Sequence, residues 1–163
     1  MRILITNPPW ETDRGYGIRS NSRWPHIRPD KHLQFPIFLA YTASCLEQDK
    51  HEVKVIDAVA DEFNGQAFLD AVKKFNPDLV FMETATPSFA QDIANAQNLK
   101  NSGLGVYLFG THVSAFYREL IPQHKAIDGG IRGEYEFIIR EIARGLPKDQ
   151  IKGLAYWDQP QNK

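Results

Sequence analysis

One stretch of the chain, Asp78-Leu-Val-Phe-Met-Glu-Thr-Ala-Thr-Pro-Ser88, constrains the fold more than any other. Residues 79–82 form an unbroken apolar run, which is typical of a strand that is covered on both faces. Small hydroxyl-bearing residues follow, and Pro87 suits the first turn of a helix because its missing N–H costs nothing there. We therefore expect a buried strand that delivers hydroxyl groups to its C-terminal tip, the edge at which open α/β sheets bind ligands. A threonine-rich helix cap without a ligand is the alternative.

Short apolar runs alternate with helical patterns along the rest of the chain. Strands are expected at residues 2–6, 52–57, 79–82, 106–109 and 126–131, with a further short strand at 151–157, and helices at residues 35–48, 65–75, 87–102, 115–120 and 134–144. This alternation predicts a doubly wound α/β fold: a flavodoxin-like or Rossmann-like parallel sheet of five strands with helices on both faces. The expected strand order is 2-1-3-4-5, which places Asn7-Pro8 opposite residues 84–88 across one crevice.

A long segment, residues 9–33, interrupts this pattern and shows neither periodicity. Structureless loops beyond about 12–15 residues are uncommon in compact domains unless they are functional or disordered. Three large aromatic residues, Trp10, Tyr16 and Trp24, argue against disorder. Within a single domain that spans residues 1–163, we expect this segment to be a lid over a ligand or a docking segment for another domain.

Charge and cysteine content exclude several classes of function. A net charge of -1 gives no bulk electrostatic case for a nucleic-acid or anionic-membrane partner. No segment approaches the roughly 20 apolar residues of a membrane-spanning helix or has the pattern of a signal peptide, so a cytoplasmic location is expected. Cys45 is the only cysteine, which excludes an internal disulfide, a thiolate zinc site and a cysteine-ligated iron–sulfur cluster held by this chain alone.

The sequence contains none of the standard catalytic or nucleotide-binding motifs of α/β folds. Gly15-Tyr-Gly17 and Gly103-Leu-Gly105 lack the third glycine of a dinucleotide fingerprint, and neither leads from a strand into a helix. No Walker A sequence occurs, and Ser88 and Ser114 lack the G-x-S-x-G setting of a hydrolase nucleophile. We therefore assign no catalytic residue.

Three strand tips remain, and each continues into a loop with small, hydroxyl-bearing or glycine residues: residues 84–88, 110–114 and 132–136. Glycine lets the backbone approach a ligand closely, and helix N-termini bind anionic groups. Together the tips predict a cofactor-binding module rather than a catalyst. Two alternatives stay open: a flavodoxin-like interaction domain without a cofactor, and a small enzyme that uses the same crevice with His26, His112 or Glu134 as acid or base.

Five short motifs occur along nearly the whole chain: Asn7-Pro8-Pro9, Gly17-Ile-Arg-Ser-Asn-Ser-Arg-Trp-Pro25, Glu83-Thr-Ala-Thr-Pro-Ser88, Gly110-Thr-His-Val-Ser114 and Arg132-Gly-Glu-Tyr-Glu136. In this order and spacing they resemble the N-terminal cobalamin-binding domain of cobalamin-dependent radical SAM proteins. Each motif is short, and the specificity lies in their combination. Such proteins include methyltransferases that act on unactivated carbons and the anaerobic magnesium-protoporphyrin monomethyl ester cyclase.

The resemblance implies that cobalamin (vitamin B12) binds at the C-terminal edge of the sheet. It implies contacts from four groups of residues: Thr84, Thr86, Pro87 and Ser88 along the nucleotide tail; Gly110, Thr111, His112, Val113 and Ser114 at the corrin; Gly133, Glu134 and Tyr135 on the far side; and Asn7, Pro8, Pro9 and Trp10 under the lower face.

The resemblance also bears on how cobalt is held. Many cobalamin-binding folds supply a histidine ligand from an Asp-x-His-x-x-Gly sequence. In Asp30-Lys-His32 and Asp49-Lys-His51 the glycine position holds Phe35 and Lys54, so a base-off cobalamin without that ligand is expected. His112, at a strand tip, is the remaining candidate ligand of the metal, and a histidine that caps its own loop is the alternative.

The resemblance also implies a partner domain. Proteins of this kind carry, after the cobalamin domain, a barrel-type domain whose Cys-x-x-x-Cys-x-x-Cys motif holds a [4Fe–4S] cluster and SAM. This chain has no such motif. The resemblance therefore implies an excised or stand-alone module that works with a radical SAM domain in cis or in trans and generates no radical itself.

Overall fold

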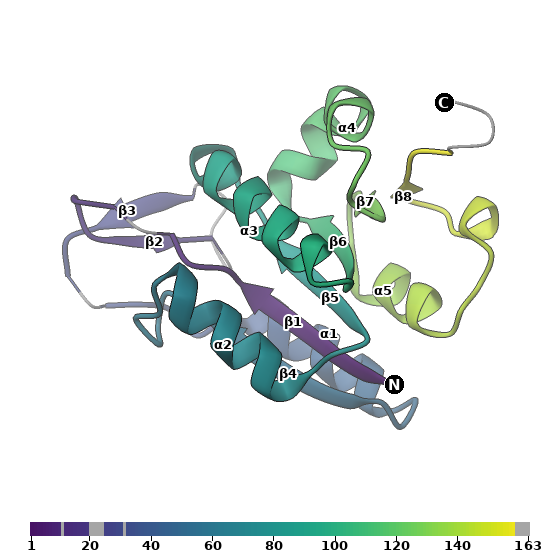
Figure 1. The fold of residues 1–163 in the computed structure, drawn as a ribbon, viewed down its shortest axis with the longest axis horizontal. Coiled ribbons are helices and arrows are strands. Elements are labelled where there is room, and N and C mark those ends of the chain that lie inside the picture. Colours follow the sequence, from purple (N-terminus) through teal and green to yellow (C-terminus); the bar gives the residue numbers. More distant parts are fainter. Residues whose placement is uncertain (11, 20–24, 31, 159–163) are drawn as a thin grey trace.

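The computed structural model describes residues 1–10, 12–19, 25–30 and 32–158. A six-stranded sheet with the order β4-β1-β5-β6-β7-β8 forms its centre (Figure 1). The strands are β1 (Arg2–Asn7), β4 (Glu52–Asp57), β5 (Leu79–Glu83), β6 (Gly105–Phe109), β7 (Gly129–Ile131) and β8 (Leu154–Ala155). All pairs are parallel except β7 with β8. This confirms the predicted doubly wound fold, the 2-1-3-4-5 order and the short extra strand at the C-terminal side.

Helices cover both faces of the sheet, and Figure 1 shows α2 and α3 in front of it with α1 behind. The helices are α1 (Ile37–Glu47), α2 (Gly65–Phe75), α3 (Phe89–Asn101), α4 (Thr111–Gln123) and α5 (Glu136–Ala143). Side chains of α2, α3 and α4 pack with Leu4 and Met82 in one core. Side chains of α1 and α5 pack with Ile5 and Phe81 in the other. Successive side chains along a strand thus pack into opposite cores, so apolar residues are needed on both faces of the strand. This explains the unbroken apolar runs of β1 and β5.

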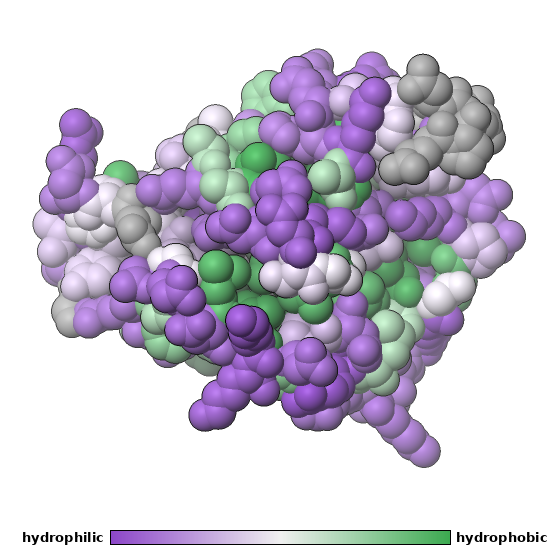
Figure 2. All heavy atoms as spheres, viewed as in Figure 1, coloured by the Kyte–Doolittle hydropathy of each residue, from purple (hydrophilic) through white to green (hydrophobic). Residues whose placement is uncertain are grey.

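The face of the molecule that carries α2 and α3 is mostly hydrophilic. Figure 2, viewed from the same side, shows hydrophilic side chains over most of this face, with apolar surface in small areas between them. Among the described residues, no helix has both the length and the apolar character needed to cross a membrane.

Helix α4 differs from its prediction at both ends. The sequence predicted residues 115–120 with a stop at Pro122, whereas α4 begins at Thr111 directly after the Gly110 turn and continues through Pro122 to Gln123. Phe116 has non-helical φ and ψ angles of -120° and 16°, so the helix is kinked there. Proline is tolerated at residue 122 because the helix ends one residue later, and its missing N–H removes a hydrogen bond only in the last turn.

The long segment is more regular than its sequence suggested. Its described part contains β2 (Tyr16–Ile18) and β3 (His26–Arg28), which pair antiparallel as a separate two-stranded sheet. Strands of three residues are too short to show a period, which is why the sequence predicted a loop. Trp24, one of the aromatics cited above, lies outside the described residues.

Candidate cofactor-binding site

A cavity of about 820 Å³ opens at the C-terminal edge of the sheet, over the tips of β5, β6 and β7. It reaches the first turns of α4 and α5, and two described residues of the long segment, Arg19 and Pro25, line one of its walls. Its volume lies in the range of small-molecule and cofactor sites, about 300–1,000 Å³. It is lined by Arg19, Pro25, Phe38, Glu83, Thr84, Ala85, Gly110, Thr111, Ser114, Ala115, Gly133, Glu134, Tyr135 and Glu136.

Gly110 brings the tips of β5 and β6 together beneath this cavity. Its φ is +113°, and a Cβ atom there would lie 2.4 Å from the carbonyl oxygen of Thr84. The N–H of Thr84 donates to the carbonyl of Phe109, at 2.8 Å, and continues the pairing past the end of the strands. Only glycine fits both the backbone angle and the close approach, so Gly110 shapes the floor of the cavity.

Seven of the residues predicted for the cofactor site line the cavity: Thr84, Gly110, Thr111, Ser114, Gly133, Glu134 and Tyr135. The other predicted residues near β5 and β6, namely Thr86, Pro87, Ser88, His112 and Val113, lie beside the cavity and do not line it. Sequence reasoning did not select Phe38, Ala115, Glu83, Ala85, Glu136, Arg19 and Pro25 as site residues. The last five stand inside the quoted motifs, so the motifs themselves carried the signal.

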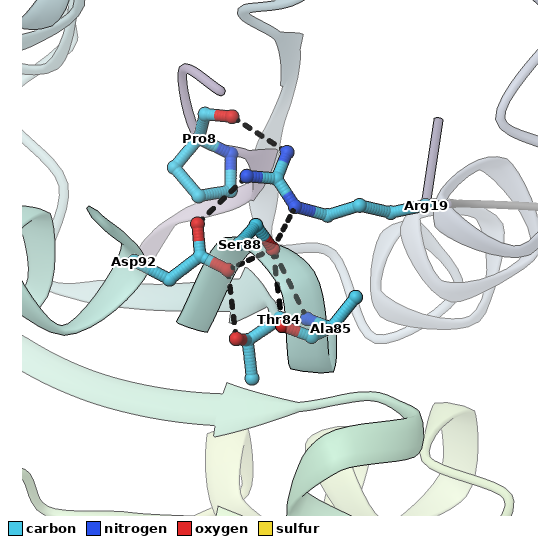
Figure 3. Close-up of polar contacts among 6 residues, drawn as sticks. All are labelled: Pro8, Arg19, Thr84, Ala85, Ser88 and Asp92. Carbon is cyan, nitrogen blue, oxygen red and sulfur yellow. Dashed lines mark hydrogen bonds and ion pairs between the residues drawn. The ribbon is translucent and has the colours of Figure 1, made fainter. Parts of the chain in front are cut away.

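Ser88 and Thr84 belong to a buried polar network around Asp92 (Figure 3). The Asp92 carboxylate accepts hydrogen bonds from the Ser88 hydroxyl, at 2.6 Å, and from the Thr84 hydroxyl, at 2.7 Å. It also pairs with the Arg19 guanidinium at 2.7 Å, and the side chains of Arg19 and Asp92 are 1% and 0% exposed. Burial raises the pKa of Asp92, whereas the Arg19 charge and the two hydroxyl groups act in the opposite direction.

Arg19 also fills the space between the tips of β1 and β5. Its Nη1 donates to the carbonyl of Pro8 at 2.7 Å, and its Nε donates to the Ser88 hydroxyl at 3.1 Å. The sequence placed Asn7-Pro8 opposite residues 84–88 across one crevice; in the structure these tips do face each other, with the Arg19 side chain between them (Figure 3). The open cavity therefore lies one strand further along, toward β6 and β7.

The residues predicted under the lower corrin face lie on the other side of Arg19. Asn7 lines a small pocket with Gly17 and Asp57, and burial raises the pKa of Asp57. Trp10 is 6% exposed and packs on Gly17, where a Cβ atom would lie 1.9 Å from its ring. Asn7 and Trp10, like Pro8 and Pro9, are absent from the lining of the large cavity.

His112 is held by neighbours in the turn before α3, on α3 and on α4. Its Nδ1 lies 3.1 Å from the Thr86 hydroxyl, and its ring centroid lies 4.1 Å from that of Phe89 and 4.9 Å from that of Phe116. Burial lowers the pKa of His112, so the ring is neutral at pH 7. In the part of the chain that the structure describes, no group of three or more His, Cys, Asp or Glu residues is arranged to hold a metal ion.

Carboxylates gather on the α5 side of the cavity. Glu83, at the tip of β5, is 8% exposed, while Glu134 and Glu136 stand at the start of α5. Burial, followed by the charges of these three carboxylates, raises the pKa of Tyr135, whose ring lies 4.3 Å from that of Phe109. The Tyr135 hydroxyl therefore stays protonated and can donate a hydrogen bond.

Comparison with solved structures supports this reading of the fold. The cobalamin-dependent S-adenosylmethionine radical enzyme OxsB, with aqua-cobalamin and S-adenosylmethionine bound, superposes with a TM-score of 0.76 at 12% identity. The match covers 99% of this chain and 21% of that enzyme. The form with aqua-cobalamin alone gives a TM-score of 0.72 at 11% identity, with the same coverage of both chains.

Two curated proteins match over nearly the whole chain. An uncharacterized methyltransferase of Pyrococcus horikoshii is 33% identical over 163 residues, which cover 96% of this chain and 32% of that protein. The anaerobic magnesium-protoporphyrin IX monomethyl ester cyclase of Cereibacter sphaeroides is 24% identical over 169 residues, which cover 97% of this chain and 25% of the cyclase. The chain thus spans about a third or less of these relatives. The B12 binding domain matches residues 31–143, more than half of the sequence, and the chain therefore belongs to the B12 binding domain family.

Proposed function

We propose that this chain is the cobalamin-binding module of a cobalamin-dependent radical SAM enzyme of the methyltransferase or magnesium-protoporphyrin ester cyclase type. The observation that carries the proposal is the cavity of about 820 Å³ at the C-terminal edge of the sheet, in a member of the B12 binding domain family. The similarity to OxsB and to the two curated relatives supports the assignment to this class of enzyme.

The lining of the cavity suits the edge of a corrin ring, which carries several amide side chains. The hydroxyls of Thr111 and Ser114 can donate to amide oxygens, and the carboxylates of Glu134 and Glu136 can accept from amide N–H groups. Gly133, with φ of +74° and open space where a Cβ would lie, lets the backbone approach the ring. We assign the cofactor contacts to the predicted residues that line the cavity, together with Glu83, Ala115 and Glu136.

The base-off form of the cofactor is part of the proposal. His112 is engaged with Thr86 and two phenyl rings and does not line the cavity, so it is poorly placed to ligate cobalt. Cobalamin supplies the cobalt chemistry, and this chain's residues bind and orient it. The [4Fe–4S] cluster and SAM belong, in this proposal, to a radical SAM domain that acts in cis or in trans.

Reconstitution tests the proposal directly, because cobalamin is coloured. The protein is mixed with hydroxocobalamin and desalted, and the visible spectrum of the protein fraction is recorded. We expect retention of about one cobalamin per chain, which would distinguish this module from a flavodoxin-like interaction domain without a cofactor. A colourless protein fraction, with the fold intact by circular dichroism, would reject the proposal.

A further inference from the structure

Arg19 connects the long segment to the βα core through a buried side chain. The residue directly follows β2, and its three guanidinium nitrogens donate to three separate parts of the protein. Nη1 binds the Pro8 carbonyl just after β1, Nε binds Ser88 just before α3, and Nη2 binds Asp92 in the first turn of α3. Because each nitrogen already donates within the protein and the side chain is 1% exposed, Arg19 is suited to hold structure together.

The partner of Arg19 makes this connection hard to release. Asp92 is completely buried, and its other hydrogen bonds come from the Ser88 and Thr84 hydroxyls. Removing one member of a buried ion pair is strongly destabilising because it leaves an uncompensated charge in the interior. In the folded protein Arg19 and Asp92 therefore stay together, and the end of β2 is fixed relative to α3.

Arg19 fastens the two-stranded β2–β3 sheet to the core, and not only its own side chain. The β2 and β3 strands pair through Tyr16, Gly17 and Ile18. Trp10 packs on Gly17, and its ring centroid lies 5.2 Å from the Arg19 guanidinium carbon. Pro25, which precedes β3, lines the cavity together with Arg19. Displacement of Arg19 would therefore move a wall of the cavity.

We infer that Arg19 is a positioning residue that fastens the long segment to the core through Asp92, Ser88 and Pro8 and thereby sets one wall of the corrinoid cavity. The inference rests on the proposed function, because it assigns this wall a part in cobalamin binding. It assigns no direct contact between Arg19 and the cofactor.

A double variant separates this role from a loss of folding. Arg19→Met alone would leave Asp92 buried without its cation, so we combine it with Asp92→Asn, whose side-chain oxygen still accepts from Ser88 and Thr84. The matched control is Arg28→Met with Asp30→Asn. It removes an ion pair of 2.9 Å that lies within the long segment and does not reach the core. Amide hydrogen exchange and hydroxocobalamin affinity are measured for both double variants and for the unmodified protein.

We expect the R19M/D92N variant to exchange the amides of residues 16–18 and 26–28 about tenfold faster, with exchange in β5 and β6 unchanged. We expect its cobalamin affinity to fall by about tenfold or more, whereas the control keeps that of the unmodified protein. Unchanged exchange in the long segment would overturn the inference, and so would faster exchange with undiminished affinity. If the unmodified protein binds no cobalamin, the proposed function fails, and the exchange rates alone decide whether Arg19 fastens the segment.

Discussion

Arg140 binds the carboxylate of Asp49 through both arms of its guanidinium, with Nε at 2.8 Å from Oδ2 and Nη2 at 2.6 Å from Oδ1. Arg144, one turn further along the chain, adds two more hydrogen bonds to the same carboxylate. Asp49 lies in the turn between α1 and β4. Its contacts with Arg140 and Arg144 therefore fasten α5 to the C-terminal end of α1. Asp49 belongs to one of the two Asp-x-His sequences that were compared with the cobalt-ligand motif. In the structure, this aspartate holds two helices together.

The contacts of Asp49 with Arg140 and Arg144 predict that the stability of the protein depends on pH. Hydrogen bonds from Arg140, then from Arg144, hold the pKa of Asp49 well below its usual range. A carboxyl group whose pKa is lowered on folding stabilises the protein above its ordinary pKa of about 3.9, and that stabilisation is lost as the pH falls below it. We expect Asp49→Asn to lower the free energy of unfolding at pH 7 and to have a smaller effect at pH 3.

Urea unfolding at the two pH values measures this difference. Asp61→Asn is the control, because Asp61 is exposed at the surface, and we expect little change at either pH. An Asp49→Asn effect that is equal at pH 7 and pH 3 would show that the carboxylate charge is not what stabilises this contact.

Filling the cavity should prevent cobalamin binding. Ala115 is exposed on α4 and lines the cavity, so Ala115→Trp places a large ring in the space without disturbing the core. We expect at least an approximately tenfold loss of affinity, equivalent to about 1.4 kcal/mol, in a titration followed by visible absorbance. Ala94→Trp, on the exposed side of α3 and away from the cavity, should bind as the unmodified protein does. Equal binding by both variants would place the cofactor elsewhere.

Gly110 should be the glycine least tolerant of substitution near the site. Its φ of +113° and ψ of -175° lie in a region that only glycine adopts readily, and the conformation costs other residues about 1–3 kcal/mol. The contact of 2.4 Å between a new Cβ and the Thr84 carbonyl adds to this. We expect Gly110→Ala to lower the free energy of unfolding, measured in urea, by more than Gly145→Ala does.

Gly145 is the matched control for this substitution. Its φ is +75°, but no atom lies within 4 Å of the position that a Cβ would take, so Gly145→Ala isolates the backbone effect. A smaller loss for Gly110→Ala than for Gly145→Ala would contradict the close approach of β5 and β6.

Cobalt bound to this domain should lack a nitrogen ligand from His112. Thr86, Phe89 and Phe116 hold the ring beside the cavity rather than in it. In the electron paramagnetic resonance spectrum of bound cob(II)alamin, an axial nitrogen splits each cobalt line into three. We expect unsplit lines, unchanged in His112→Ala. Three-fold splitting that disappears in that variant would identify His112 as a ligand.

The order of the sheet could be predicted because each βα unit carries its own local pattern. The strand at residues 52–57 and the helix at residues 65–75 have the predicted limits in the structure, as β4 and α2. The Asn64 side chain caps the start of that helix, and Asn76, in a left-handed conformation before Pro77, ends it. Such signals lie within a few residues of the boundary that they set.

The Arg19 network could not be predicted in the same way. Arg19 and Asp92 are 73 residues apart, and no local pattern shows that two charged residues will be buried together. Thr84 and Ser88 were chosen because they follow a strand, but the sequence does not show that their hydroxyls are bonded to Asp92. Phe38 lies on α1, far from any strand tip, so no local pattern showed that it would line the cavity.

The two outermost strands of the sheet bear on the tendency of the protein to aggregate. Edge strands expose unpaired backbone groups that invite pairing with another chain, and proteins counter this with charge or short length. Here β4 carries Glu52, Lys54 and Asp57 among its six residues, and β8 is two residues long. Neither edge is a good template for a further strand, so the sheet is protected against edge-to-edge growth at both sides.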